Sequence, residues 1–109
     1  MGALVLGELE QVVLLAALRV GDDAYGVTVL HEIARQTGRE LTLATVHKTL
    51  ARLEEKGYVT SRMGEPTPTR GGRRKRHYAV TPAGRQAVRA SLAALRRLAR
   101  GLAVGWDTP

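Results

Sequence analysis

Apolar residues recur with the spacing of an α-helix in the first part of the chain. Between Glu8 and Val20 they fall at i, i+3, i+4, i+7 and i+8, and further leucines widen the stripe. A helix that is apolar on nearly every side belongs in the middle of a fold, so we expect this segment to be the central helix. Gly21 follows it, where a residue past a helix end often needs positive φ.

A second helical pattern follows with a narrower apolar stripe. Asp23 is placed to cap a helix over Ala24–Gln36, and Thr37 and Gly38 close it. We expect a short extended piece over Arg39–Leu41.

A third helix opens at Thr42, which is a good N-cap residue, and ends at Gly57. Its residues Val46, Leu50 and Leu53 fall at i, i+4 and i+7, so they are predicted to point inward. The rest of this helix is polar, which leaves a broad face for solvent or a partner.

The pattern then changes from helical to alternating. Tyr58–Met63 and Lys75–Val80 are predicted strands, separated by a loop rich in glycine and proline. The two strands predict a β-hairpin with a long tip. Strand alternation turns Tyr78 inward and leaves His77 on the other face.

The last predicted element is a helix from Pro82 to about Leu102, with Thr81 as its cap. The order of helices and strands is that of a winged helix-turn-helix, in which three helices form the core and the hairpin is the wing. We therefore expect a mainly α fold with a small β-hairpin and an added C-terminal dimerisation helix. The predicted boundaries are a DNA-binding domain over residues 1–81, a dimerisation helix over residues 82–104 and a tail over residues 105–109.

Length and composition narrow the class of protein. A chain of 109 residues fits one domain, and the lack of cysteine removes disulfides and thiolate metal sites. No stretch approaches the roughly 18 apolar residues of a membrane span, and the N-terminus lacks the basic region of a signal peptide. We expect a cytoplasmic protein with no membrane partner.

Basic charge is confined to the C-terminal part of the chain. Residues 1–65 hold seven Lys and Arg against nine Asp and Glu, whereas residues 66–106 hold ten Lys and Arg and no acid. This asymmetry points to a polyanionic partner, most commonly nucleic acid. A soluble domain that happens to be basic is the alternative.

The outer face of the third helix suits the major groove of double-stranded DNA. It combines small residues, which allow close approach, with long donors for base edges and phosphates. An ordinary solvated helix face is the alternative interpretation. The residues on this face are Ala44, Thr45, Lys48, Thr49 and Arg52.

A cluster of cations in the predicted wing strengthens the DNA-binding interpretation. It consists of Arg70, Arg73, Arg74, Lys75 and Arg76, in a seven-residue span that also contains two glycines. Such donors can follow a curved phosphate path, and a polyanion relieves their mutual repulsion. The alternative is a flexible loop coated with charge.

The C-terminal helix carries an apolar seam with spacings of 4, 3, 4 and 3 residues. Self-pairing through this seam would present two recognition helices to a pseudo-palindromic site about one DNA turn apart. Folding back on the first helix of the same chain is the alternative, and both arrangements are compatible. The predicted dimerisation residues are Leu9, Val13, Val88, Leu92, Leu95, Leu98, Ala99 and Leu102.

Catalytic and metal-binding patterns are missing from the sequence. The three histidines form no close-spaced ligand pair, and there is no nucleophile triad, carboxylate pair or phosphate loop. We expect neither an enzyme nor a cofactor. Trp106 is interpreted as a tail residue rather than a ligand platform, because Gly101 and Gly105 weaken the helix before it.

Segments from Leu6 to about Leu102 resemble a known family. They are LGELEQVVLLAAL, DDAYGVTVLHEI, LTLATVHKTLARLEEKGYV, GGRRKRHYAVTPAGR and the helix that follows. The Ala-Tyr-Gly step, the LARLEEKGYV run and the RRKRHY-VTPAGR run, in this order and spacing, make the match fairly specific. With these residues the chain resembles the PadR family of transcriptional regulators, in particular its short members with a single C-terminal helix.

The resemblance implies a homodimeric winged-helix protein that binds DNA, usually a repressor released by a small-molecule effector or an environmental signal. It also implies residue roles. Tyr25 would contact a phosphate at the start of the second helix, Thr45, Lys48 and Arg52 would face the groove, and Arg73–Arg76 would form the wing contact.

The chain departs from the family pattern at two positions of the third helix. The family usually has tyrosine at the position of His47 and often proline at that of Lys48. A histidine can make a similar bond to a phosphate, and the bond is stronger when the ring is protonated. Some members clamp a flat aromatic ligand between the dimer halves, but residues 82–102 contain no Phe or Trp to support such a site.

The sequence therefore predicts a sequence-specific DNA-binding transcriptional regulator, a repressor that binds a pseudo-palindromic operator as a homodimer. The alternative function is a basic protein-interaction module that docks an acidic regulatory partner. A gel shift in the presence of competitor DNA distinguishes the two.

Overall fold

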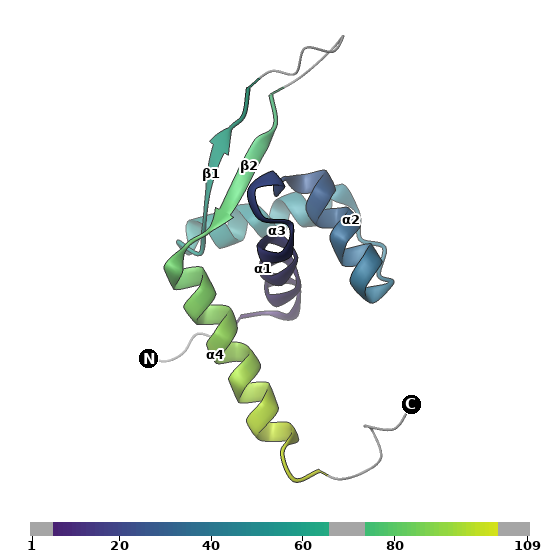
Figure 1. The fold of residues 1–109 in the computed structure, drawn as a ribbon, viewed down its shortest axis with the longest axis vertical. Helices are drawn as coiled ribbons and strands as arrows, with labels where there is room; N and C mark the ends of the chain where they lie inside the picture. Colours follow the sequence, from purple (N-terminus) through teal and green to yellow (C-terminus); the bar gives the residue numbers. More distant parts are fainter. Residues whose placement is uncertain (1–5, 66–73, 103–109) are drawn as a thin grey trace.

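The computed structural model describes residues 6–65 and 74–102, and it confirms the predicted fold class (Figure 1). The described part is mainly helical, with one two-stranded antiparallel hairpin and a C-terminal helix. The elements are α1 (Glu8–Val20), η1 (Gly21–Asp23), α2 (Gly26–Thr37), α3 (Leu43–Glu55), β1 (Val59–Met63), β2 (Arg76–Val80) and α4 (Pro82–Ala99).

Helix α1 lies at the centre of the fold, as its apolar pattern predicts. It packs against α2, α3, β2 and the first part of α4. Its residues Val13 and Leu14 are fully buried. These four elements therefore have α1 as a common support.

The three helices and the hairpin share one apolar core. The inward positions predicted for α3 are fully buried, together with side chains from α2, β1 and α4. Removing one of these large side chains would leave a cavity, which typically costs about 2–5 kcal/mol for Leu→Ala. The core residues outside α1 include Val29, Ile33, Val46, Leu50, Leu53, Val59 and Val88.

Glu10 is a buried carboxylate on α1 that is fully paired. It accepts a hydrogen bond from the backbone N–H of Gly7 at 2.8 Å and from Lys56 Nζ at 2.7 Å. Burial raises the pKa of this carboxyl, but the hydrogen bonds from Lys56 and Gly7, together with the charges of Lys56 and Arg52, lower it by more, so the net pKa is lowered. The pair ties the first turn of α1 to the end of α3.

The start of α2 differs from the prediction. Asp23 does not cap the helix, because it ends the 3₁₀ turn η1 and α2 begins only at Gly26. The hydroxyl of Thr28 takes the capping role, accepting from the Tyr25 backbone N–H at 3.0 Å and donating to the Asp23 carbonyl at 2.6 Å. Thr28, in the first turn of α2, therefore makes the capping hydrogen bonds that were predicted for Asp23, which precedes the helix.

The turn between α2 and α3 contains no strand at residues 39–41, contrary to the prediction. Gly38 has a left-handed φ of 76° and closes α2. Thr42 caps α3 as predicted, since its Oγ1 accepts from the Thr45 backbone N–H at 3.1 Å. The segment is therefore a tight helix-to-helix turn rather than an edge strand.

The hairpin is antiparallel, with Val59 opposite Val80 and Met63 opposite Arg76. Each strand begins one residue later than predicted. The backbone N–H of Tyr78 donates to the carbonyl of Ala24 at 2.8 Å, which fastens β2 to the segment before α2. The wing is thus attached directly to the helix-turn-helix.

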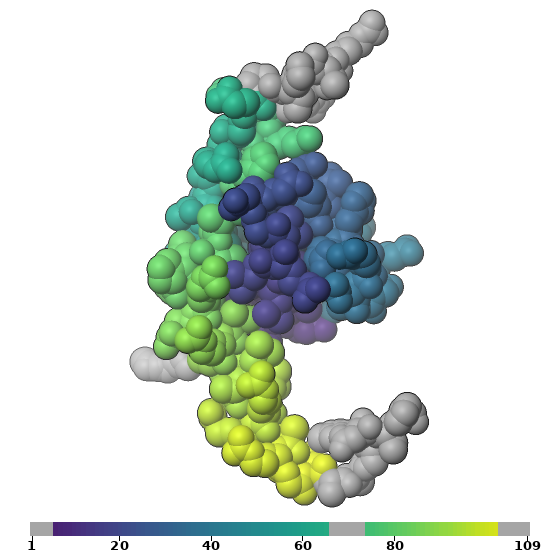
Figure 2. Space-filling view, in the orientation of Figure 1, coloured from purple at the N-terminus to yellow at the C-terminus, as the bar shows by residue number. Residues whose placement is uncertain are grey.

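Helix α4 begins in close contact with the hairpin. Thr81 Oγ1 accepts from the Gly84 backbone N–H at 3.0 Å and donates to the Gly57 carbonyl at 2.8 Å. A Cβ at Gly84 would collide with the carbonyl oxygen of Tyr58, so only glycine allows this approach. From there α4 leaves the core and extends away from the hairpin, and its distal half stands clear of the body (Figure 2).

Among residues 6–65 and 74–102, no helix is both long enough and apolar enough to cross a bilayer.

Candidate nucleic-acid interface

The exposed side of α3 is narrower than the sequence predicted. Lys48 and Arg52 are exposed, and Ala44 and Ala51 lie beside them as small exposed residues. Thr45 is half-buried, and its Oγ1 accepts a hydrogen bond from Thr42 Oγ1 at 2.9 Å. The face therefore offers two long cations beside two alanines, a composition that fits close approach to a groove, with Glu55 exposed at the end of the helix. Ala51 was not among the predicted residues.

Thr49 does not belong to this face, which corrects the prediction. Its residue exposure is 3%, and its Oγ1 donates to the Thr45 carbonyl at 2.8 Å. Thr49 lies three residues after Val46 and four before Leu53, so it occupies the i+3 place of the buried stripe. The hydroxyl is satisfied by the backbone of its own helix and is not available to DNA.

His47 lies against the first turn of α2. A Cβ at Gly26 would overlap the His47 ring at Nε2 and Cδ2, so the imidazole rests where a side chain would otherwise stand. This contact explains why glycine follows Ala24 and Tyr25. The N-cap residue Tyr25 makes no side-chain hydrogen bond to the first amides of α2, and these amides carry a partial positive charge.

Tyr25, at the start of α2, also contacts two residues of the wing, His77 and Lys75. The His77 ring meets its ring edge-on, with centroids 5.3 Å apart and an interplanar angle of 68°. Lys75 Nζ lies 4.8 Å from the centroid of the Tyr25 ring, within the range of a cation–π contact. The structure thus gathers Tyr25, His47 and Lys75 from three parts of the chain around the start of α2.

The other wing cations go in different directions. Arg70 and Arg73 lie outside the described residues. Arg74 Nε donates to the Gly64 carbonyl at 3.2 Å. Arg76 lies on the opposite face of the hairpin from Lys75, where its Nη1 donates to Ser61 Oγ at 3.1 Å.

Ser61 connects that opposite face of the wing to α3. Its hydroxyl donates to Glu54 Oε2 at 2.7 Å, so Arg76, Ser61 and Glu54 form one chain of hydrogen bonds. Tyr78 lies on the same face, and burial raises the pKa of its phenol, although the Arg76 charge partly opposes this. This side of the wing is engaged within the protein.

The apolar seam of α4 divides into two parts, which corrects the predicted dimerisation set. Val88 is 4% exposed and belongs to the core, as does Val13 of α1, so neither is available to a partner. Leu98, in contrast, is 75% exposed, and Leu95 and Leu102 are also exposed. The first part of the seam packs against the core of its own chain, and the rest continues along α4 beyond the core. Leu9, Leu92 and Ala99 are half-buried.

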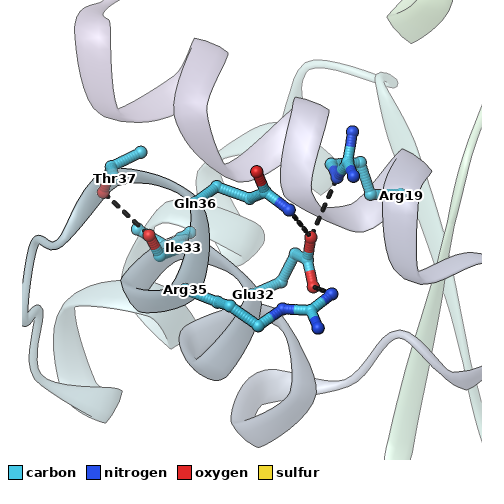
Figure 3. Close-up of polar contacts among 6 residues, drawn as sticks. All are labelled: Arg19, Glu32, Ile33, Arg35, Gln36 and Thr37. Carbon is cyan, nitrogen blue, oxygen red and sulfur yellow. Dashed lines mark hydrogen bonds and ion pairs between the residues drawn. The ribbon is translucent and has the colours of Figure 1, made fainter.

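An apolar groove of about 440 Å³ lies between α1 and α2 and was not predicted. Glu32 stands at its rim and binds Arg19 Nε at 2.9 Å, Arg35 Nη2 at 3.1 Å and Gln36 Nε2 at 2.9 Å (Figure 3). The Gln36 and then the Arg19 hydrogen bonds lower the pKa of Glu32. The sequence signal was the row of leucines that widens the stripe of α1. The apolar lining is Val12, Leu15, Ala16, Leu18 and Ile33.

No cluster of three or more His, Asp or Glu that could hold a metal ion occurs in the part of the chain that the structure describes.

Solved structures of transcriptional regulators share this fold. One from Clostridium thermocellum is 24% identical, with a TM-score of 0.71, covering 86% of this chain and 88% of that one. A PadR family regulator from Eggerthella lenta is 23% identical, with a TM-score of 0.68, covering 94% and 88%. Bacillus subtilis PadR in complex with operator DNA is 21% identical, with a TM-score of 0.66, covering 78% of this chain but 46% of that protein.

These distant structures show the fold alone, and the family assignment comes from comparison with sequence families. No curated protein sequence matches the chain. Residues 14–90, however, match the family described as the transcriptional regulator PadR-like family. The match runs from the middle of α1 into α4 and includes the helix-turn-helix and the wing. A family of regulators also agrees with the expectation that the chain is not an enzyme. The chain therefore belongs to the PadR-like family of transcriptional regulators.

Proposed function

We propose that the protein is a sequence-specific DNA-binding repressor. The observation that carries the proposal is the meeting of Tyr25, His47 and Lys75 at the first turn of α2, beside the exposed Lys48 and Arg52 of α3. Hydrogen-bond donors on the two sides of a helix-turn-helix can hold the DNA backbone while the second helix of the motif contacts base edges. The Bacillus subtilis protein, which has a similar fold, was crystallised in complex with operator DNA, and this supports DNA as the partner.

Each residue of the interface has a proposed role. Lys48 and Arg52 enter the major groove, where a long cation can pair with guanine or with the flanking phosphates. Tyr25, His47 and Lys75 bind phosphate and fix the register. Thr45 has a smaller role, because its side chain is half-buried, although its hydroxyl, which accepts from Thr42 Oγ1, can still donate.

The wing is proposed to track the backbone. Arg74, together with Arg70 and Arg73, carries the phosphate contacts of the tip. Arg76 contributes less, because its guanidinium is bonded to Ser61 on the face turned towards α3.

The protein is further proposed to act as a homodimer. The exposed leucines of distal α4 and the apolar groove between α1 and α2 are two uncovered apolar surfaces on one chain. A second copy related by a two-fold axis can cover both, since an isologous interface uses each surface twice. Leu95, Leu98 and Leu102 then seat against the partner's α1 and α2, and the two α3 helices face one side of a duplex.

Selection of bound duplexes from a random pool tests the proposal. A protein that binds DNA as a dimer should enrich two inverted half-sites whose centres lie about one helical turn apart. Enrichment of a single unrepeated half-site would remove the dimer from the proposal. Loss of all binding under competitor DNA would favour the docking of an acidic protein instead.

Repression is tested separately, with a reporter gene placed behind the selected site. Occupation of a promoter by a dimer blocks polymerase by excluded volume, so expression of the protein lowers the reporter signal. A rise in the signal would show activation.

A further inference from the structure

His77 connects the wing to the start of α2 and has no role in the DNA contacts above. Its side chain is 18% exposed, and its ring meets Tyr25 edge-on. The Nε2 atom lies 3.7 Å from Asp23 Oδ1, while Nδ1 is buried without a hydrogen-bond partner among the described residues. An imidazole on a solvated strand face would have water at both nitrogens, so this ring is held by packing.

The hairpin confines the ring from its other side. A Cβ at Gly64 would come within 3.0 Å of His77 Cε1 and Nδ1. The Gly64 backbone N–H donates to the Lys75 carbonyl at 2.7 Å, which fixes that strand end. His77 is thus enclosed between Gly64 of the wing stem and Tyr25 of the helix-turn-helix.

The Tyr25 ring contacts the His77 ring and the ammonium group of Lys75. No described residue hydrogen-bonds to the Tyr25 hydroxyl, and Lys75 is a long and exposed side chain. Of these two neighbours His77 is the more rigid, because backbone bonds hold β2 at Ala24 on one side of it and at Gly64 on the other.

We propose that His77 is a positioning residue for DNA binding, which holds the Tyr25 ring so that its hydroxyl meets a phosphate. The inference rests on the proposed function of this surface. Asp23 Oδ1 lies 3.7 Å from the Nε2 atom of the same ring, on the segment that precedes Tyr25. His77 acts through Tyr25 and does not itself touch the duplex.

Substitutions of His77 test the inference through duplex affinity. The probe is a short fluorescent duplex of mixed sequence, titrated with the full chain and followed by anisotropy at fixed salt. His77→Ala should weaken binding about 3- to 10-fold, the range that follows from removing one edge-to-face aromatic pair. His77→Phe keeps the aromatic edge and should bind within about twofold of the parent.

A paired substitution separates positioning from damage to the wing. Tyr25→Phe removes the hydroxyl but leaves the ring. In a protein that carries Tyr25→Phe, the further change His77→Ala should cost less than about twofold, because no hydroxyl remains to be oriented. Melting temperatures of all variants serve as the control for folding, and His77→Gln, which also lacks a ring, replaces His77→Ala if the alanine variant does not fold.

Any of three results would overturn the inference. One is parental affinity in His77→Ala, or in His77→Gln where that variant stands in. Another is an equal loss with and without the Tyr25 hydroxyl, and the third is no rescue by His77→Phe. If the parent itself binds no duplex, the proposed function fails instead, so the two failures are distinguishable.

Discussion

Helix α3 and the distal half of α4 each leave one side uncovered, and the two sides have opposite chemistry. The uncovered side of α3 includes Lys48 and Arg52 beside two alanines, whereas that of distal α4 includes Leu95 and Leu98. The basic side is well solvated in the free protein and gains from a polyanion, because binding releases counterions. The apolar side gains from being removed from water, at about 25 cal/mol per Å². One chain therefore offers two surfaces that suit two different partners.

The largest expected effect is on the free energy of unfolding. It should appear when a leucine on the buried side of α3 is truncated, but not when one on the exposed side of α4 is. Leu50→Ala should lower the free energy of unfolding by about 2–5 kcal/mol, since Leu50 is fully buried. Leu98→Ala should change it by less than about 0.5 kcal/mol in protein dilute enough to be monomeric. Urea unfolding followed by circular dichroism measures both. Equal losses would mean that distal α4 is packed within the monomer.

Charge placed on the apolar side of α4 should abolish self-association. Leu95→Asp combined with Leu98→Asp would bury unpaired carboxylates in a dimer interface, which costs several kcal/mol. We expect a monomer by light scattering at micromolar concentration, with little change in helix content. Ala90→Asp, on an exposed position of the same helix, is the matched control and should stay dimeric. A dimer that survives the double change would place the interface elsewhere.

A smaller effect is expected at the contact between α2 and α3. Gly26→Ala places a Cβ where the His47 ring lies, and the ring, at the end of a flexible side chain, swings aside. Duplex affinity should fall about 2- to 10-fold, the worth of one hydrogen bond, while the melting temperature changes by a few degrees at most. The same change should add nothing to His47→Ala. An additive loss would show that the methyl group itself clashes with DNA.

The smallest effect concerns acid stability. The pKa of Glu10 is lower in the folded protein than its ordinary value of 4.5, because its hydrogen bonds from Lys56 and Gly7, together with nearby positive charge, outweigh its burial. The carboxylate therefore stabilises the fold fully above pH 4.5, and this contribution is lost as the pH falls through the folded-state pKa. Glu10→Gln should flatten the fall in unfolding free energy below about pH 5. An unchanged acid slope would contradict the pairing.

Helical periodicity predicted much of the core of the fold. The i, i+4, i+7 spacing identified Val46, Leu50 and Leu53 correctly. In α1 the predicted positions Val13, Ala16 and Ala17 are buried, but Leu9 and Val12 are half-buried and Leu14, outside the template, is fully buried. Thr49 fits the i+3 position of that template, but its hydroxyl suggested a polar face, and the backbone acceptor at Thr45 could not be read from the sequence. A short polar side chain can complete a buried stripe when its own helix supplies the acceptor.

Contacts between segments that are distant in the sequence could not be predicted from it. The ring of His47 on Gly26 and the ring of His77 on Tyr25 join residues with no common period, so no spacing reveals them. The seam of α4 is likewise continuous in sequence, although Val88 lies in the core and Leu98 outside it. Where a helix leaves the body depends on how it is attached, here through the close approach of Gly84 to Tyr58.

The salt dependence of duplex binding, measured with two charge-matched pairs of substitutions, shows whether the surface around α3 and the start of α2 binds DNA. Lys48→Ala with Arg52→Ala removes two cations from α3, and Arg96→Ala with Arg97→Ala removes two exposed cations from distal α4. We expect the α3 pair to weaken binding and to reduce the slope of log affinity against log salt by about 0.9 for each phosphate that is no longer neutralised. The α4 pair should leave both nearly unchanged. Equal effects of the two pairs would show that net charge, and not the surface around α3 and the start of α2, holds the DNA.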